Sequence, residues 1–290
     1  MSVLNSSWKH DLIHANGLDL HYVTQGEGKL MLLLHGFPEF WYSWRHQIPT
    51  FADTYKVVAL DLRGYNESDK PQEVEAYRMA ELIRDVEAVI TGLGYEDCIL
   101  VGHDWGGAIA WNFAYERPQM VEKLIIMNLP HPVIFSGSLR QNPQQLLRSW
   151  YVFLFQVPLL PEFLLQLFDY EAIASAFQSL AIDKTTFTRA DLNAYKDAAA
   201  KRGALTAMVN YYRNITESIT RSRSWPILDI PTLMIWGEED AALGKELTYG
   251  TEVYVKDFRI KYIPNCSHWV QQEQPQLVNQ YMRDFLDENL

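Results

Sequence analysis

A carboxylate stands at the centre of a glycine-bounded turn that follows a short apolar run. The run is Cys98–Val101, and residues 102–107 then read Gly-His-Asp-Trp-Gly-Gly before a segment with helical spacing of apolar residues. Small residues on both sides permit a strained strand-to-helix turn that exposes the central side chain, and the following helix N-terminus stabilises its negative charge. The spacing predicts an ionised nucleophile at Asp104, with an ordinary helix N-cap as the alternative.

An aspartate nucleophile performs a different reaction from a serine nucleophile. Its carboxylate attacks an electrophilic sp³ carbon and leaves an alkyl ester on the enzyme. Release of the product then requires a base that activates water. We therefore expect a two-step covalent mechanism at Asp104. Simple ester hydrolysis is disfavoured, because a hydroxyl nucleophile suits that reaction better.

The candidate base is His268, in the Cys-Ser-His-Trp sequence of residues 266–269. It follows a strand-like segment, Phe258–Ile263, and precedes the last helical pattern. Where nucleophile, acid and histidine follow one another in that order along the chain, the histidine takes this late position. His268 alone among the eight histidines fits it, although a single histidine is more often a structural residue.

The base needs a carboxylate that orients it, and Asp240 is the candidate. It follows the strand-like run Thr232–Trp236, where Glu238 and Glu239 compete for the same role. The other place for this acid, at the end of the preceding strand, is occupied by Asn128. A neutral amide cannot stabilise an imidazolium as a carboxylate can.

A second turn of interest follows the apolar run Leu30–Leu34, where residues 35–39 read His-Gly-Phe-Pro-Glu. Where a strand-to-helix turn carries the nucleophile, a main-chain N–H of a second turn of this kind joins the N–H of the residue after the nucleophile, and the two bind an oxyanion. The candidate donors are the amides of Phe37 and Trp105. A purely structural turn is compatible with the same sequence.

Short apolar runs alternate with segments of helical periodicity along much of the chain. Runs of this length, bounded by Gly, Pro, Asp or Asn, favour buried strands, and their alternation with helices predicts an α/β fold with a mostly parallel central sheet and helices on both faces. Leu18–Val23 alternates and follows an Asn-Gly hairpin signal. The other expected strands are Leu30–Leu34, Val57–Leu60, Cys98–Val101, Leu124–Met127, Thr232–Trp236 and Phe258–Ile263, and the expected helices are Tyr77–Leu93, Gly107–Tyr115 and Gln274–Leu290.

The alternation stops after residues 130–132, which read Pro-His-Pro, and resumes near Trp225 and Pro226. The sequence between them is rich in Ala, Leu and Gln and contains no convincing strand. We therefore predict a core domain formed by residues 1–131 and 226–290, with an inserted all-α cap, or lid, at residues 132–225.

Composition narrows the classes of function. The chain has 290 residues and a formal net charge of −11, which argues against a nucleic-acid partner and against anionic membranes. The most apolar stretch, residues 150–168, contains polar residues and two prolines, so no membrane span is expected. Two cysteines form no disulfide framework and residues 1–11 lack the apolar run of a signal peptide, which favours a cytoplasmic protein. No metal motif or dinucleotide fingerprint occurs, so we expect no cofactor.

These motifs together resemble the epoxide hydrolase branch of the α/β-hydrolase superfamily. The resemblance runs from about Asp11 to the end and rests on residues 35–39, 61–65 (Asp-Leu-Arg-Gly-Tyr), 102–107 and 266–269. It implies the α/β-hydrolase fold and hydrolysis of a small apolar epoxide to a vicinal diol. Haloalkane dehalogenases share most of these motifs and the aspartate nucleophile, so a dehalogenase is the alternative.

The cap separates these two readings. Epoxide hydrolases use two cap tyrosines that hydrogen-bond the epoxide oxygen, because an alkoxide is a poor leaving group that needs a proton donor. Residues 210–214 resemble the family's Tyr-Arg-Asn motif and imply that Tyr212 is one of them. Tyr151 is the expected second tyrosine, with Trp150 and Tyr211 as competing neighbours. In a dehalogenase, Trp105 would instead hold a halide.

A third interpretation belongs to a different class. Some proteins of this fold bind a small apolar ligand without turning it over, but such a protein is expected to lack the base or the acid. A complete set, Asp104, Asp240 and His268, is present here. The sequence leaves the choice of epoxide, the attacked carbon and the oligomeric state open.

Overall fold

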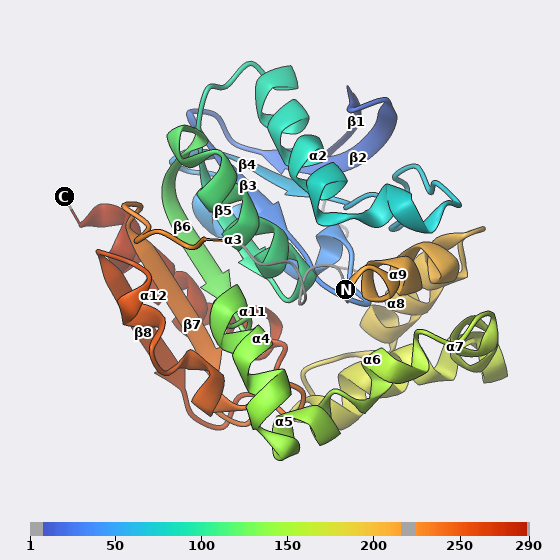
Figure 1. Cartoon of the computed structure of the whole chain (residues 1–290). Coiled ribbons are helices and arrows are strands. Elements are labelled where there is room, and N and C mark those ends of the chain that lie inside the picture. Colours follow the sequence, from blue (N-terminus) through green and yellow to red (C-terminus); the bar gives the residue numbers. More distant parts are fainter. Residues whose placement is uncertain (1–7, 216–223, 289–290) are drawn as a thin grey trace.

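The computed structural model describes residues 8–215 and 224–288 and is organised around an eight-stranded sheet with the strand order β1-β2-β4-β3-β5-β6-β7-β8 (Figure 1). The six strands from β4 to β8 in this order pair in parallel, whereas β1 and β2 join the edge in antiparallel fashion. The strands are β1 (Lys9–Ala15), β2 (Leu18–Gln25), β3 (Lys29–Leu34), β4 (Tyr55–Leu60), β5 (Cys98–His103), β6 (Val121–Met127), β7 (Thr232–Gly237) and β8 (Phe258–Ile263).

The expected strands are therefore confirmed, and one strand was not predicted. Strand β1 carries His10 and Asp11, lies at the sheet edge and is largely solvent-exposed, so it has no continuous apolar run to mark it. The hairpin signal was informative, because Asn16 and Gly17 both adopt positive φ between β1 and β2. Strands β3 and β5 are almost wholly buried, as expected for parallel strands covered on both faces.

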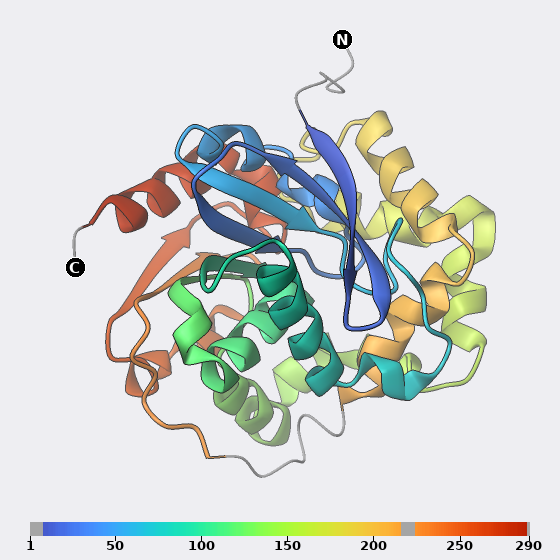
Figure 2. The same cartoon turned by 90° about the horizontal axis from the view of Figure 1, so that it is seen from above.

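Helices cover both faces of the sheet. Figure 2 shows α2 (Met79–Gly92) and α3 (Trp105–Glu116) on one face and α1 (Ile48–Phe51) and α12 (Pro275–Asp287) on the other. A short helix, α11 (Val270–Glu273), precedes α12. The predicted helices are confirmed, although α2 begins two residues late and residues 289–290 of the last one lie outside the described chain.

The described residues between β6 and β7 form six helices and no strand. We call them the cap helices, and Figure 1 shows them beyond one end of the sheet. The first begins at Pro132, and residues 216–223 of the predicted insertion lie outside the described chain. They are α4 (Pro132–Gln141), α5 (Pro143–Arg148), α6 (Trp150–Leu154), α7 (Leu160–Leu180), α8 (Arg189–Ala200) and α9 (Ala204–Arg213).

The longest cap helix, α7, is interrupted. Leu167 is extended and Phe168, Asp169 and Tyr170 have positive φ, so the segment is two helices joined by a left-handed turn. Among the described residues, no helix has the length and hydropathy needed to cross a bilayer.

Candidate active site

Asp104 lies at the turn between β5 and α3 with φ of 49° and ψ of −120°, a conformation that is strained for a residue with a side chain. The flanking glycines are required by close backbone contacts. A Cβ on Gly102 would lie 2.4 Å from the Gly106 oxygen, and one on Gly106 would lie 2.0 Å from the Leu34 oxygen. Asp104 occupies the N-cap position of α3, but its side chain makes no capping hydrogen bond, so capping does not explain the aspartate.

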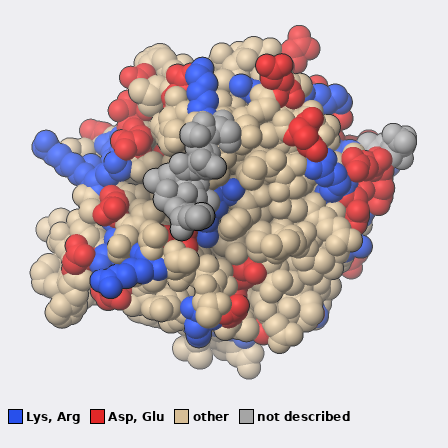
Figure 3. Space-filling model, turned by 180° about the vertical axis from the view of Figure 1, so that it is seen from behind, with Lys and Arg blue, Asp and Glu red and all other residues tan. Residues whose placement is uncertain are grey.

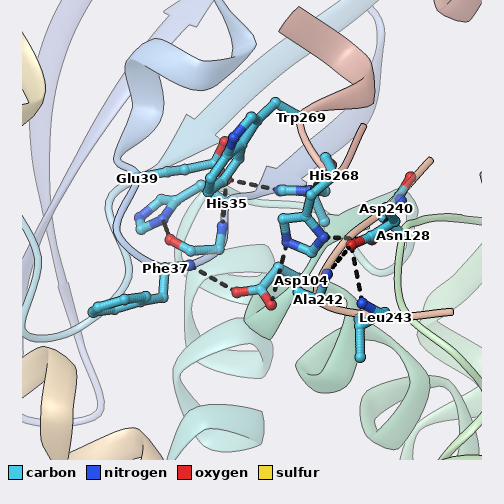
Figure 4. Close-up of polar contacts among 12 residues, drawn as sticks. His35, Phe37, Glu39, Asp104, Asn128, Asp240, Ala242, Leu243, His268 and Trp269 are labelled. Carbon is cyan, nitrogen blue, oxygen red and sulfur yellow. Dashed lines mark hydrogen bonds and ion pairs between the residues drawn. The ribbon is translucent and has the colours of Figure 1, made fainter. Parts of the chain in front are cut away.

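The Asp104 carboxylate lies between Phe37 and His268 (Figure 4). Its Oδ1 accepts a hydrogen bond of 2.8 Å from the Phe37 amide, and its Oδ2 lies 3.6 Å from His268 Nε2. Burial acts to raise the pKa of Asp104, but the interaction with nearby His268 outweighs it and holds that pKa below the ordinary value. The nucleophile is therefore ionised at neutral pH.

His268 lies between two carboxylates, and Asp240 orients it. Its Nδ1 donates to Asp240 Oδ2 at 2.7 Å. Burial acts to lower the pKa of His268, but Asp240 and Asp104 raise it well above the ordinary value. Burial likewise acts to raise the pKa of Asp240, and His268 holds that pKa low. The resting site is thus an imidazolium between two carboxylates.

Main-chain and side-chain donors fix the acid in turn. Asp240 Oδ1 accepts hydrogen bonds from the amides of Ala242 (2.8 Å) and Leu243 (2.9 Å), and Oδ2 accepts one from Asn128 Nδ2 at 2.7 Å. The competing acids lie elsewhere, because Glu238 pairs with Lys245 and Glu239 accepts from the Cys266 amide. Asn128, which the sequence analysis treated only as an unsuitable acid, therefore contacts the acid itself.

One of the two expected backbone donors contacts the nucleophile. The Phe37 amide already bonds to Asp104. Trp105 is the first residue of α3, so its amide is one of the N–H groups that no carbonyl of the helix can accept. Both remain candidate donors to the carbonyl oxygen of an ester formed on Asp104.

The two predicted tyrosines come together beside Asp104 from different cap helices. Tyr151 belongs to α6 and Tyr212 to α9, and their ring centroids are 5.8 Å apart. Burial, followed by the charge of Asp104, raises the pKa of both phenols well above the ordinary value. Both phenols are therefore neutral proton donors at neutral pH.

Of the neighbours that competed with them, Tyr211 faces the core, whereas Trp150 is largely exposed and also borders a cavity that Asp104 lines. The Tyr211 hydroxyl donates to the Arg63 main-chain oxygen at 2.8 Å, and the side chain is fully buried in the core. Trp150 is 62% exposed.

Two largely apolar cavities share Asp104, Tyr151 and Tyr212 as lining residues. We call them the narrow cavity, of about 100 Å³, and the wide cavity, of about 500 Å³. The narrow cavity is lined by Ala108, Leu129, Phe135, Val152 and Leu243, among others, and the wide cavity by Leu154, Phe155, Leu165, Leu180 and Trp269, among others.

A buried polar network beneath the site was missed by the sequence analysis. Glu39 Oε2 accepts from the Gly36 amide at 2.9 Å and lies 2.8 Å from His103 Nδ1, and His103 Nε2 lies 2.8 Å from the His268 main-chain oxygen. A carbonyl only accepts, so His103 Nε2 carries a proton, and a second proton lies between Nδ1 and Glu39. Both residues belong to the motifs of residues 35–39 and 102–107, and their polar character beside strands expected to be buried was the available signal.

Glu39 is completed on its other side by two amides. Its Oε1 accepts from Gln271 Nε2 at 3.0 Å and from Gln272 Nε2 at 2.8 Å. The network therefore connects the turn of residues 35–39 with the segments that carry Asp104 and His268 through buried groups. Within the described parts of the chain, no group of three or more His, Cys, Asp or Glu side chains is arranged to hold a metal ion.

Comparisons with known proteins agree with this geometry. A family model described as alpha/beta hydrolase fold matches residues 29–275. Epoxide hydrolase 4 of Mus musculus is 46% identical over 283 residues, covering 95% of this chain and 78% of that protein. Epoxide hydrolase 3 of Xenopus tropicalis is 45% identical over 281 residues, covering 94% and 76%.

Solved structures give the same result. A mutant of an epoxide hydrolase from Bacillus megaterium, complexed with its naphthyloxy-propanediol product, superposes with a TM-score of 0.90 at 38% identity, covering 96% of this chain and 100% of that one.

Proposed function

The chain belongs to the α/β-hydrolase family and is an epoxide hydrolase, and from this premise we propose that it works through a covalent ester on Asp104. The observation that carries the proposal is the position of Asp104, hydrogen-bonded to the Phe37 amide and 3.6 Å from His268, in cavities that two neutral phenols also line. The product of the proposed reaction is a vicinal diol.

Ring opening is the first step. Asp104 attacks one ring carbon, the carbon–oxygen bond of the epoxide breaks, and the electron pair passes to the departing oxygen. Tyr151 and Tyr212 hydrogen-bond that oxygen, and one of them donates its proton. Neutral phenols suit this role because the alkoxide is far more basic than they are.

Ester formation also changes the base. Asp104 loses its negative charge when it is alkylated, and with it one of the two carboxylates that raise the pKa of His268. The tyrosine that protonates the alkoxide is left as a phenolate. Transfer of the imidazolium proton to this phenolate leaves both His268 and the tyrosine neutral. The base therefore becomes competent only after the first step.

Ester hydrolysis is the second step. Neutral His268, oriented by Asp240, takes a proton from water as the oxygen adds to the Asp104 carbonyl carbon. The amides of Phe37 and Trp105 stabilise the oxyanion. Collapse breaks the bond to the product oxygen, which takes its proton from His268. The resulting Asp104 carboxylic acid gives its proton back to His268, and the resting pair returns.

The cavities support a substrate with two unequal sides. The narrow cavity has room for a small substituent and the wide cavity for a larger apolar one. The paired phenols favour an epoxide over the alternative haloalkane, because a departing halide needs no proton. Two buried free cysteines are compatible with the proposed cytoplasmic location.

Intact-protein mass spectrometry of His268→Gln, incubated with styrene oxide or with 1-bromobutane, tests the proposal. We expect an added mass equal to the whole epoxide, because the ester forms and persists. The matched control Asp104→Ala should gain nothing. An alkyl adduct formed only with 1-bromobutane would move the assignment to a dehalogenase, and no adduct with either compound would refute the ester.

A further inference from the structure

The cap carries an unusually large group of exposed apolar side chains. The described chain exposes fifteen large apolar residues, and ten of them lie within residues 146–168, on α5, α6, the start of α7 and the links between them. Single exposed apolar residues are normal on a protein surface, whereas a concentration of this kind marks an interaction site. We call these ten the apolar cap face: Leu146, Leu147, Trp150, Phe153, Val157, Leu159, Leu160, Phe163, Leu164 and Phe168.

This face is electrically neutral although the chain has a net charge of −11. Residues 143–168 contain only two charged residues, Arg148 and Glu162. Arg148 lies 3.7 Å from Glu246, and Glu162 lies 2.9 Å from Arg213. Figure 3 shows Lys, Arg, Asp and Glu interspersed over much of the molecule seen from behind, whereas the lowest edge of that view carries uncharged residues.

Two side chains connect the apolar cap face with the lining of the wide cavity. Trp150 and Leu164 are exposed by 62% and 37%, and both line that cavity with Asp104 and His268. An apolar molecule on this face can therefore contact side chains that also line the wide cavity, whose lining includes one basic residue, Arg148, besides Asp104 and His268. Four of the ten side chains are Trp or Phe, which favour the boundary between lipid and water.

We propose that the apolar cap face docks on an electrically neutral lipid surface, such as a phosphatidylcholine bilayer, and that apolar epoxides enter the wide cavity directly from the lipid. The entry of substrate rests on the proposed function, whereas docking does not. Neutral lipid fits because the face has no net charge, and the acidic remainder of the chain is repelled by anionic lipid. The docking is peripheral, since only the outer side of three cap helices is apolar and exposed.

Flotation with phosphatidylcholine vesicles measures docking directly. The triple variant Leu147→Ser, Phe153→Ser, Phe168→Ser removes three exposed side chains that line neither cavity. We expect its vesicle affinity to fall roughly a hundredfold, since each side chain contributes part of its full transfer free energy. The matched control Leu12→Ser, Ile227→Ser, Val253→Ser removes three apolar residues exposed elsewhere and should bind like the wild type.

Styrene oxide dissolved in buffer provides the readout for the proposed function. Both triple variants should hydrolyse it at the wild-type rate, whereas only the cap variant should lose turnover of an epoxide supplied in vesicles. Absence of styrene oxide turnover in every protein would refute the proposed function and leave vesicle binding unaffected.

Three results would overturn the docking proposal. One is a wild type that does not float with phosphatidylcholine vesicles, and another is a cap variant that floats equally well. The third is a wild-type dimer, seen by sedimentation, that the cap variant converts to a monomer without any vesicle binding, which would assign the face to a second copy of the chain.

Discussion

The two halves of the active site are held in different ways. On the sheet side, each catalytic group is fixed by directed hydrogen bonds, as when the Phe37 amide bonds Asp104 and Asn128 bonds Asp240. On the cap side, the tyrosines are held by aromatic packing, with the Tyr212 ring centroid 5.3 Å from that of Phe37 and 5.1 Å from that of Trp105. Directed bonds fix an angle and a protonation state, whereas packing fixes mainly a position. The sheet side thus supplies the groups for the covalent chemistry, and the cap side supplies the proton donors and part of the walls of the cavities.

Removing the nucleophile should have the largest effect. Asp104→Ala leaves no group to form the ester, and we expect turnover to fall by about 10⁴-fold or more. Steady-state hydrolysis of styrene oxide measures it. Near-normal turnover would contradict the role given to the sheet side, because catalysis would then not depend on its nucleophile.

Breaking the buried network should cost stability. Glu39→Gln removes the carboxylate that shares a proton with His103 and accepts two glutamine amides, and the unfolding free energy should fall by about 3–5 kcal/mol. Urea denaturation measures the change. Glu122→Gln, which breaks an exposed ion pair of 2.8 Å with Lys29, is the control and should cost about 1 kcal/mol or less. Equal costs would contradict a special role for the network.

Loss of one phenol should be milder than loss of the nucleophile. Tyr151→Phe and Tyr212→Phe each leave one donor for the alkoxide, and we expect ring opening to slow by about 10–100-fold with less effect on ester hydrolysis. Pre-steady-state kinetics separate the two steps. Tyr211→Phe is the matched control, because its hydroxyl bonds the Arg63 main chain. If Tyr211→Phe slowed ring opening as much as Tyr212→Phe, the assignment of Tyr212 as a proton donor would be wrong.

The smallest expected effect concerns pH. The raised pKa of His268 contributes stability fully below about pH 6.5, and this contribution is lost as pH rises through the folded-state pKa. Asp104→Asn removes one of the two raising charges, so its stability should begin to fall at a lower pH than that of the wild type. Urea denaturation at a series of alkaline pH values measures this. Identical profiles would show that Asp104 does not act on His268.

The sheet side was the easier half to predict from the sequence. The turn at Asp104 is possible only because Gly102 and Gly106 lack a Cβ, which would clash with neighbouring backbone atoms. The strand, the turn and Asp104 are therefore encoded together within a few residues. The base could likewise be predicted, because His268 occupies the late position that the order of nucleophile, acid and histidine requires. The edge strand β1 was missed because its exposed residues carry no apolar run.

The cap side depends on contacts between distant segments. Tyr151 and Tyr212 are 61 residues apart in the numbering and meet only when α6 and α9 pack together, so the resemblance to a family had to identify them. The network of Glu39 and His103 is non-local too, since residues far apart in the chain complete it. Its geometry could be seen only in three dimensions.

A single turnover in H₂¹⁸O, with enzyme in excess over styrene oxide, tests the covalent ester most directly. If Asp104 attacks the ring, its own oxygen leaves with the product, and the oxygen from water remains in its carboxylate. We predict an unlabelled diol after the first turnover and ¹⁸O in the peptide that contains Asp104. A labelled diol with an unlabelled Asp104 would show direct attack by water and would contradict the account.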